Sequence, residues 1–140
     1  MYLRGTVLSD NGYNFLTWDC ERDGCFNKVH RLKFHVFADC FPNKINFSDV
    51  DGIVEMKGKV LMLEWKSKKG TLPLGQQIMY TRISITGDTT VLCIVGSAET
   101  MECTHYGFFW KGKWNKYRTA TLLDIKDFIK RWVGYVTIPY

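Results

Sequence analysis

The sequence predicts a mixed α/β domain in which a central mixed β-sheet is flanked by helices. Two strand-like runs, at 50–56 and 59–65, are joined by the hairpin signal Lys57-Gly58. A helical segment and another strand follow, and the chain ends in a second hairpin and a helix. The 140 residues divide poorly into two cores, so we expect residues 1–140 to form a single domain.

The N-terminal third gives weaker signals. The first eight residues form a predicted strand that ends at the turn sequence Ser9-Asp10-Asn11-Gly12. Residues 25–30 indicate a short helix or a loop. At 32–38 apolar residues alternate along the chain, which predicts a strand.

The central segments are clearer. The run at 60–63 is apolar at every position, as expected of a strand buried inside a sheet. A helix is predicted at 74–84, after Gly70 and Pro73. Residues 90–95 are β-branched and aliphatic, which predicts another buried strand.

The C-terminal third predicts an added hairpin and helix. The hairpin pairs 105–110 with 113–118 around Lys111-Gly112. The helix at 121–133 begins at Thr121, a good capping residue. Its apolar face is expected to comprise Leu122, Ile125, Phe128, Ile129 and Trp132.

Charge and composition limit the class of protein. The net charge of +5 suits a polyanionic partner such as nucleic acid, although ordinary solubility is the alternative reason for it. No apolar run approaches the roughly 18 residues that span a bilayer, and the first residues lack a signal-peptide stretch. We therefore expect a soluble cytoplasmic protein with no membrane partner. The five cysteines contain no C-x2-C pair and are odd in number, which disfavours a zinc ribbon or a disulfide framework.

One segment carries the residue types of a hydrolytic metal site. Asp51 opens one central strand, and Glu64 and Lys66 close the next as Glu-x-Lys. The start of one hairpin strand lies beside the end of its partner, so Asp51 and Glu64 should converge. Strand alternation puts Glu64 and Lys66 on one face and Trp65 on the other. Two carboxylates suit Mg²⁺ or Mn²⁺, and Lys66 beside them can position or activate a water.

This segment resembles the core motif of the PD-(D/E)xK nuclease superfamily, which includes restriction endonucleases and archaeal Holliday-junction resolvases. The thirteen-residue step from Asp51 to Glu64 is similar to that of the resolvase-like branch. Gln76 and Tyr80 resemble the Q-x-x-x-Y motif of the RecB-type branch, and their spacing puts them on one helix face. The resemblance implies a restriction-endonuclease-like core with Asp51, Glu64, Lys66, Gln76 and Tyr80 as catalytic residues. The wider string from residue 40 to residue 76 also resembles small phage and prophage proteins.

The resemblance further implies that Asp51, Glu64 and the backbone carbonyl of Trp65 bind the metal. Two other acids are left open. Asp49 would serve either as a ligand or as a cap of the preceding turn. Many superfamily members add a glutamate from an early helix, and Glu21 is the candidate here, although its neighbours show no clear helical pattern. The proline that usually precedes the first acid is absent.

Basic and aromatic residues suggest where nucleic acid would bind. Phosphate contacts are expected from Lys57, Lys68 and Lys69, clustered around the acidic pair, and from Lys111 and Lys113 on the second hairpin. Solvated surface lysines are the alternative. Two tryptophans of that hairpin are expected either to stack on bases or to pack in the core, namely Trp110 and Trp114.

These features predict a Mg²⁺-dependent deoxyribonuclease, a phosphodiesterase that acts on DNA, with RNA left open as substrate. The alternative is a catalytically inactive nuclease-fold module that binds nucleic acid or a host protein. Resolvase-like members usually act as dimers, so the resemblance also raises a homodimer. The apolar surface of the last helix would serve such an interface or the core of the domain.

Overall fold

The computed structural model describes residues 6–8, 14–16 and 32–138. The chain divides into two compact units, Met1–Ser48 and Asp49–Tyr140, and each is described by itself. The expectation of one domain over 1–140 stays a prediction. The segment at 25–30 lies outside the described residues.

In the first unit, strands β1 (Thr6–Leu8) and β2 (Asn14–Leu16) pair in antiparallel fashion. The described strand covers only part of the predicted one, and its turn lies outside the described residues. The predicted strand at 32–38 is wrong, because Phe34–Cys40 forms a 3-10 helix, η1. Side chains three residues apart lie on the same side of such a helix. Phe34 and Phe37 accordingly both contact Phe47, with ring centroids 6.0 and 5.8 Å away.

The second unit is built on a five-stranded mixed sheet with strand order β3-β4-β5-β6-β7. Only β4 and β5 are parallel, and the other neighbours are antiparallel. The predicted strands are confirmed with small shifts of their ends. Their bounds are β3 (Gly52–Met56), β4 (Lys59–Lys66), β5 (Thr89–Gly96), β6 (Cys103–Trp110) and β7 (Lys113–Thr119).

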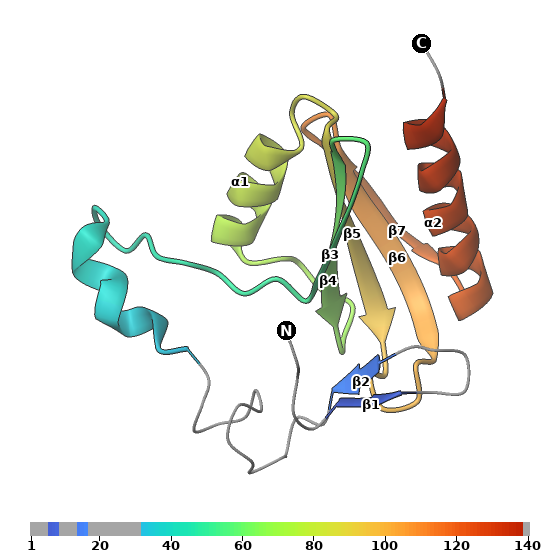
Figure 1. Ribbon diagram of the computed structural model, residues 1–140, viewed down its shortest axis with the longest axis horizontal. Helices are drawn as coiled ribbons and strands as arrows, with labels where there is room; N and C mark the ends of the chain where they lie inside the picture. The colour runs from blue at the N-terminus through green and yellow to red at the C-terminus, as the bar shows by residue number, and fades with distance from the viewer. Residues whose placement is uncertain (1–5, 9–13, 17–31, 139–140) are drawn as a thin grey trace. The chain divides into compact units, whose positions relative to one another are not determined.

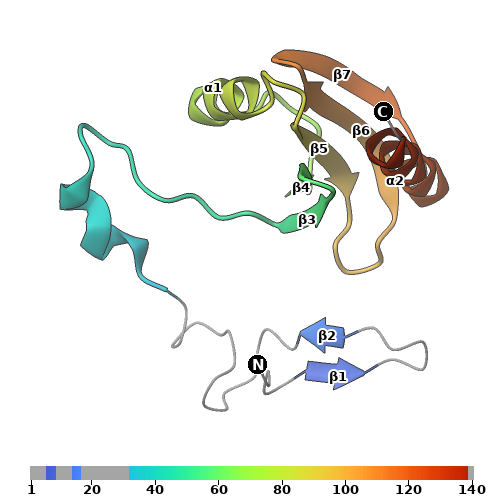
Figure 2. The same cartoon turned by 45° about the horizontal axis from the view of Figure 1, so that its top comes forward.

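Two helices cover opposite faces of this sheet, α1 (Leu74–Ile83) and α2 (Leu122–Thr137) (Figures 1 and 2). Helix α1 makes the crossover between the parallel strands β4 and β5, a connection that parallel neighbours require. The coarse prediction of a mixed sheet flanked by helices is therefore confirmed. The described residues contain no helix long and apolar enough to cross a membrane.

Each face of the sheet has its own apolar core, because β4 and β5 are covered on both sides. The core under α1 is the smaller and comprises Leu72, Tyr80, Val91, Cys93 and Phe109. The core under α2 comprises Leu61, Leu92, Ile94, Tyr106, Ala120, Ile125, Trp132 and Val136. The apolar face of α2 thus packs on its own sheet rather than being left for a second subunit.

Local sequence signals explain the ends of several elements. Lys57-Gly58 and Lys111-Gly112 both adopt positive φ at each residue, the conformation of tight hairpin turns that match the twist of the strands. Helix α2 begins with a complete capping box, in which the side chains of Thr121 and Asp124 each accept a hydrogen bond from the other's backbone N–H.

Two neighbouring residues of α2 test how much this packing contributes to stability. The side chain of Ile125 is 1% exposed, whereas that of Leu123 is 64% exposed. We expect Ile125→Ala to lower the free energy of unfolding by about 2–5 kcal/mol, because it removes buried methyl groups and leaves a cavity. Leu123→Ala should change it by less than about 0.5 kcal/mol. Urea unfolding of both variants measures the difference, and equal effects would contradict the assignment of the buried face.

Candidate active site

Glu64 is the centre of a compact polar cluster on the face of the sheet that α1 covers. Its side chain is nearly buried, and an isolated charge there would be costly. Lys66 Nζ lies 3.0 Å from Glu64 Oε1. The Nε2 group of Gln76 donates to the same oxygen at 3.2 Å, and the Tyr80 hydroxyl donates to Oε2 at 2.9 Å. Three donors therefore compensate one buried carboxylate.

The residues of this cluster come from helix α1 and strand β4. Lys66 also donates to Oε1 of Gln76 at 3.1 Å, so Lys66, Gln76 and Glu64 form a closed triangle of contacts. Gln76 and Tyr80 lie one turn apart on α1 and both face β4, as their spacing predicts. Trp65 points to the other face, packs against the core under α2 and donates from its indole N–H to the carbonyl of Gly96.

Asp51 reaches the same end of the β3–β4 hairpin. It immediately precedes β3, and its Oδ2 accepts a hydrogen bond from the backbone N–H of Trp65 at 2.7 Å. The last backbone pair of this ladder is Gly52 with Leu63, so the carboxylate continues the ladder where the β3 backbone stops. The predicted convergence of Asp51 with the Glu64 end of β4 is found.

The oxygens at this corner suit a hard divalent cation. A carboxylate offers about four lone-pair positions, and the three donors to Glu64 leave one of them on Oε2. The N–H and C=O of a strand residue point toward the same neighbour, so the carbonyl of Trp65 faces the side of Asp51. Mg²⁺ is commonly held by one or two carboxylates with water completing its shell. Asp51, Glu64 and the Trp65 carbonyl thus form a fitting donor set.

The structure brings together five of the predicted residues, Asp51, Glu64, Lys66, Gln76 and Tyr80, and leaves Asp49 apart from them. Within the described ranges, no group of three or more His, Cys, Asp or Glu side chains is gathered as a ready-made metal site. The corner therefore has two acids, not three. Asp49 is exposed and has no hydrogen bond or ion pair with any described residue. Glu21 lies outside the described residues, so its role as a ligand stays a prediction.

The buried charge of Glu64 influences its neighbours across the sheet. Cys93 is the residue of β5 that pairs with Glu64, and it is fully buried. Burial, and then the Glu64 carboxylate, raise the pKa of the Cys93 thiol to about 12, while Lys66 acts in the opposite direction. Burial and the hydrogen bond to Glu64 also raise the pKa of Tyr80 above its ordinary value. Both groups are therefore neutral near pH 7.

The five predicted phosphate-binding lysines divide between the two ends of the sheet. Lys68 and Lys69 follow β4 directly and lie at the end near Asp51 and Glu64. Lys57 lies in the turn at the far end of the hairpin, five residue steps or roughly 17 Å from the start of β3. The expected clustering of Lys57 around the acidic pair is therefore not found, because a hairpin turn and its open end are at opposite ends of the strands.

Lys111 and Lys113 also lie at the end of the sheet that carries Lys57. The last residues of β6 pair with the first residues of β5, which run parallel to the first residues of β4. The Lys111-Gly112 turn is thus at the same end as Lys57-Gly58 (Figure 1). Contacts of these three lysines with nucleic acid stay a prediction. Any such contacts would lie at the end of the sheet opposite Glu64.

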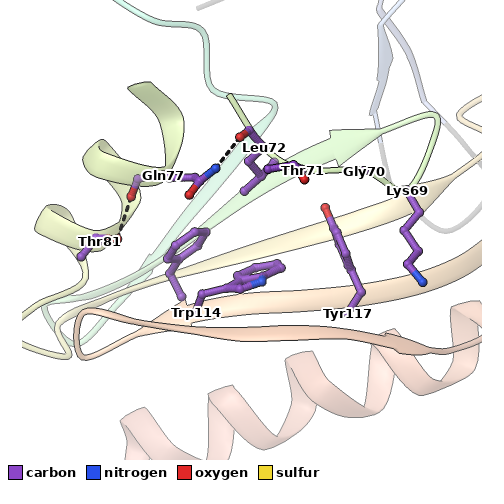
Figure 3. A pocket seen from close by; sticks show the side chains of 9 residues that line it. Lys69, Gly70, Thr71, Leu72, Gln77, Thr81, Trp114 and Tyr117 are labelled. Carbon is purple, nitrogen blue, oxygen red and sulfur yellow. Dashed lines mark hydrogen bonds between the residues drawn. The ribbon is translucent and has the colours of Figure 1, made fainter. Parts of the chain in front are cut away.

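A pocket next to this cluster contains residues that the sequence did not single out. It measures about 540 Å³ and is lined by Lys69, Gly70, Thr71, Leu72, Gln77, Thr81, Phe109, Trp114 and Tyr117 (Figure 3). Trp114 and Tyr117 are three apart, which in a regular strand would put them on opposite faces. A bulge between them, where the β6–β7 register shifts, places both on the α1 side with ring centroids 5.1 Å apart. Alternation in the sequence carries no signal for this bulge.

Comparisons with known proteins leave the family open. No protein-family model matches the chain, and no curated protein or solved structure matches it either. Membership of the PD-(D/E)xK superfamily therefore stays a prediction, and function has to be inferred from the residues at the Asp51–Glu64 corner.

The hydroxyl of Tyr117 gives a test of this face at alkaline pH. Burial, followed by the charges of Cys93 and Glu64, raises the pKa of Tyr117 to about 12 from 10.0. The unfolded chain ionises first as pH rises, so the contribution of Tyr117 is intact below pH 10 and is lost between pH 10 and 12. We expect the urea midpoint of Tyr117→Phe to fall less steeply over that range than that of the wild type. Parallel curves would contradict a buried neutral hydroxyl.

Proposed function

We propose that the protein is a metal-dependent nuclease that hydrolyses phosphodiester bonds in DNA. The observation that carries this proposal is the convergence of two carboxylates and a lysine at one corner of the sheet. Asp51 accepts a hydrogen bond from the backbone N–H of Trp65. Glu64 forms an ion pair with Lys66 and accepts hydrogen bonds from Gln76 and Tyr80. A chain that used Glu64 only for a surface ion pair would not need to bury it among three donors.

The chemistry follows from the groups at that corner. A Mg²⁺ or Mn²⁺ ion held by Asp51, Glu64 and the Trp65 carbonyl would supply Lewis acidity to the scissile phosphate. Lys66 offers a cation to the phosphate oxygens and can orient the attacking water. The oxygen of that water bonds to phosphorus, one bridging P–O bond breaks, and the leaving oxygen takes up a proton. Gln76 and Tyr80 hold Glu64 in place through their hydrogen bonds.

The basic residues beside the corner support a nucleic-acid substrate. Lys68 and Lys69 belong to the segment between β4 and α1, next to Lys66. With a net charge of +5, the chain attracts a phosphate backbone through release of counterions. DNA is the proposed substrate, and RNA would be cleaved by the same chemistry.

A binding module without turnover is the second candidate. The observation that favours it is that Glu64 is already compensated by Lys66, Gln76 and Tyr80, so its burial requires no cation. Likewise, the bond from Asp51 to Trp65 N–H can serve only to close the end of the hairpin. This candidate predicts nucleic-acid or protein binding that Asp51→Asn leaves unchanged.

Metal binding can be tested without any measurement of turnover. Asp51→Asn keeps an oxygen that can accept from Trp65 N–H but removes the charge that attracts a cation. We expect calorimetry to detect Mn²⁺ binding to the wild type and at least a tenfold weaker affinity for Asp51→Asn. Asp127→Asn, which removes an exposed carboxylate on α2, is the matched control and should bind Mn²⁺ as the wild type does. Equal affinities for all three proteins would argue against the site.

Activity is tested with single-stranded, duplex and branched DNA in Mg²⁺, Mn²⁺ or EDTA. We expect cleavage that requires the metal. The cleavage rate should fall by about 10²–10⁴-fold in Lys66→Ala, because Lys66 is placed to assist proton transfer and to offset the negative charge of the phosphate. Thermal unfolding of the variant checks that the loss is not one of folding. Undiminished metal-dependent cleavage in both Asp51→Asn and Lys66→Ala would identify a contaminant as the source.

A further inference from the structure

The pocket beside Glu64, between α1 and the β6–β7 hairpin, has the composition of a site for a flat aromatic ligand. We propose that it binds one unstacked nucleobase of the strand whose phosphate lies at Glu64. The substrate would then be single-stranded nucleic acid or a duplex with an unpaired nucleotide at that point. This inference rests on the proposed nuclease function and specifies its substrate class.

A row of paired residues connects the pocket to the site. Glu64 of β4 pairs with Cys93 of β5, and Cys93 pairs with Gly107 of β6. Strands lie about 4.8 Å apart, so Gly107 is roughly 10 Å from Glu64 on the same face. Cys93 and Gly107 are buried, so this row gives the separation of the two places, and a strand with its phosphate at Glu64 would reach the pocket over the side chains that cover the row.

Gly107 makes room for the aromatic wall of the pocket. A Cβ at position 107 would lie 2.5 Å from Cη2 of Trp114, so the indole occupies the space that a side chain there would fill. The ring centroids of Phe109 and Trp114 are 4.7 Å apart, which fixes the indole from one side. Trp114 nevertheless remains 37% exposed, and it lines the pocket. Aromatic faces held in this way stack on bases of any sequence.

Polar groups of the pocket match the edge of a base and its phosphate. The hydroxyl of Tyr117 is buried and has no hydrogen-bond partner among the described residues. Its side chain rises toward the segment that carries Gly70 and Thr71 (Figure 3). Buried hydroxyls normally have a partner, and a bound base edge would provide one. Lys69 lines the same pocket and brings a positive charge next to the strand.

The size of the pocket and its helical wall fit the same occupant. A volume of about 540 Å³ lies within the range of small-ligand sites, which accept a nucleotide and not a duplex. Gln77 presents its amide from α1 and is anchored by a 2.6 Å hydrogen bond from Nε2 to the carbonyl of Leu72. Gln76, the preceding residue, faces Glu64. Adjacent residues of α1 thus connect the polar cluster and the pocket.

The structure also distinguishes the two tryptophans of the hairpin. Trp110 contacts Tyr135 of α2, with ring centroids 6.3 Å apart, and therefore belongs to the opposite face of the sheet. Trp114 alone of the two lies on the face of Glu64. Tyr135 is 44% exposed on that opposite face and provides a matched aromatic control.

Binding is measured in EDTA, so that the result does not depend on turnover or on a bound cation. The probes are a labelled oligothymidylate and a blunt DNA duplex of equal length, followed by fluorescence anisotropy. We expect the single strand to bind at least about tenfold more tightly. Trp114→Leu should weaken single-strand binding by about five- to a hundredfold, the range for loss of one stacked base, and leave duplex binding unchanged. Tyr135→Leu should behave as the wild type.

A second variant covers the case in which Trp114→Leu fails to fold. Thr71 is exposed at the pocket, so Thr71→Glu leaves the core intact and places a negative charge where the strand would lie. We expect it to weaken single-strand binding at least about tenfold. Equal affinity for the two probes, or single-strand binding that a folded Trp114→Leu or Thr71→Glu leaves unchanged, would overturn the proposal.

The outcomes also distinguish this inference from the proposed function. Metal-dependent cleavage without preference for the single strand would retain the nuclease and reject the pocket. Single-strand preference that depends on Trp114, without cleavage in any metal, would retain the pocket and reject the nuclease.

Discussion

The buried carboxylate of Glu64 is the constraint on which the second unit, Asp49–Tyr140, depends. A charge at that depth must be compensated, and the compensation comes from two different elements. Lys66 follows along the same strand, whereas Gln76 and Tyr80 come from the helix that crosses over the sheet. The position of α1 along β4 is thereby fixed by polar contacts as well as by the small core beneath it.

The same requirement separates the two faces of the sheet by chemistry. On the α1 face, polar contacts around Glu64 lie beside Tyr80 and Cys93, in a core of few residues. On the α2 face, the packing is almost wholly apolar, and Trp65 joins it from the strand position between Glu64 and Lys66. One strand thus carries the charged side chains Glu64 and Lys66 on one side and packs Trp65 into the apolar core on the other. This division places the polar cluster on a strand that is packed from both sides.

Much of the second unit could be predicted, because its signals are local. The turns at Lys57-Gly58 and Lys111-Gly112, the capping box at Thr121 and the Glu64-x-Lys66 pair depend on residues close in sequence. Their pairing across the hairpin then follows from strand geometry. The first unit could not be predicted in this way, since alternating apolar residues at 32–38 fit both a strand and a 3-10 helix that gathers its aromatic rings.

Other parts of the site escaped prediction because they depend on contacts between distant residues. The shift that turns Trp114 and Tyr117 to one side arises from the pairing of β6 with β7, and the sequence of β7 alone does not encode it visibly. The position of Lys57 was misjudged for a simpler reason. Proximity in sequence to Asp51 suggested proximity in space, whereas the intervening strand carries Lys57 to the other end of the sheet.

The contact between Gly107 and Trp114 has a consequence for how this protein can diverge. Any side chain at 107 would collide with the indole and with the backbone oxygen of Asn115, 2.8 Å from an added Cβ. A substitution at either position therefore constrains which residue the other can carry. A relative that keeps a large aromatic residue at 114 should keep glycine at 107, and one that gains a side chain at 107 should have lost the ring and changed the course of β7 at Asn115. Positions 107 and 114 are therefore expected to change together among related sequences.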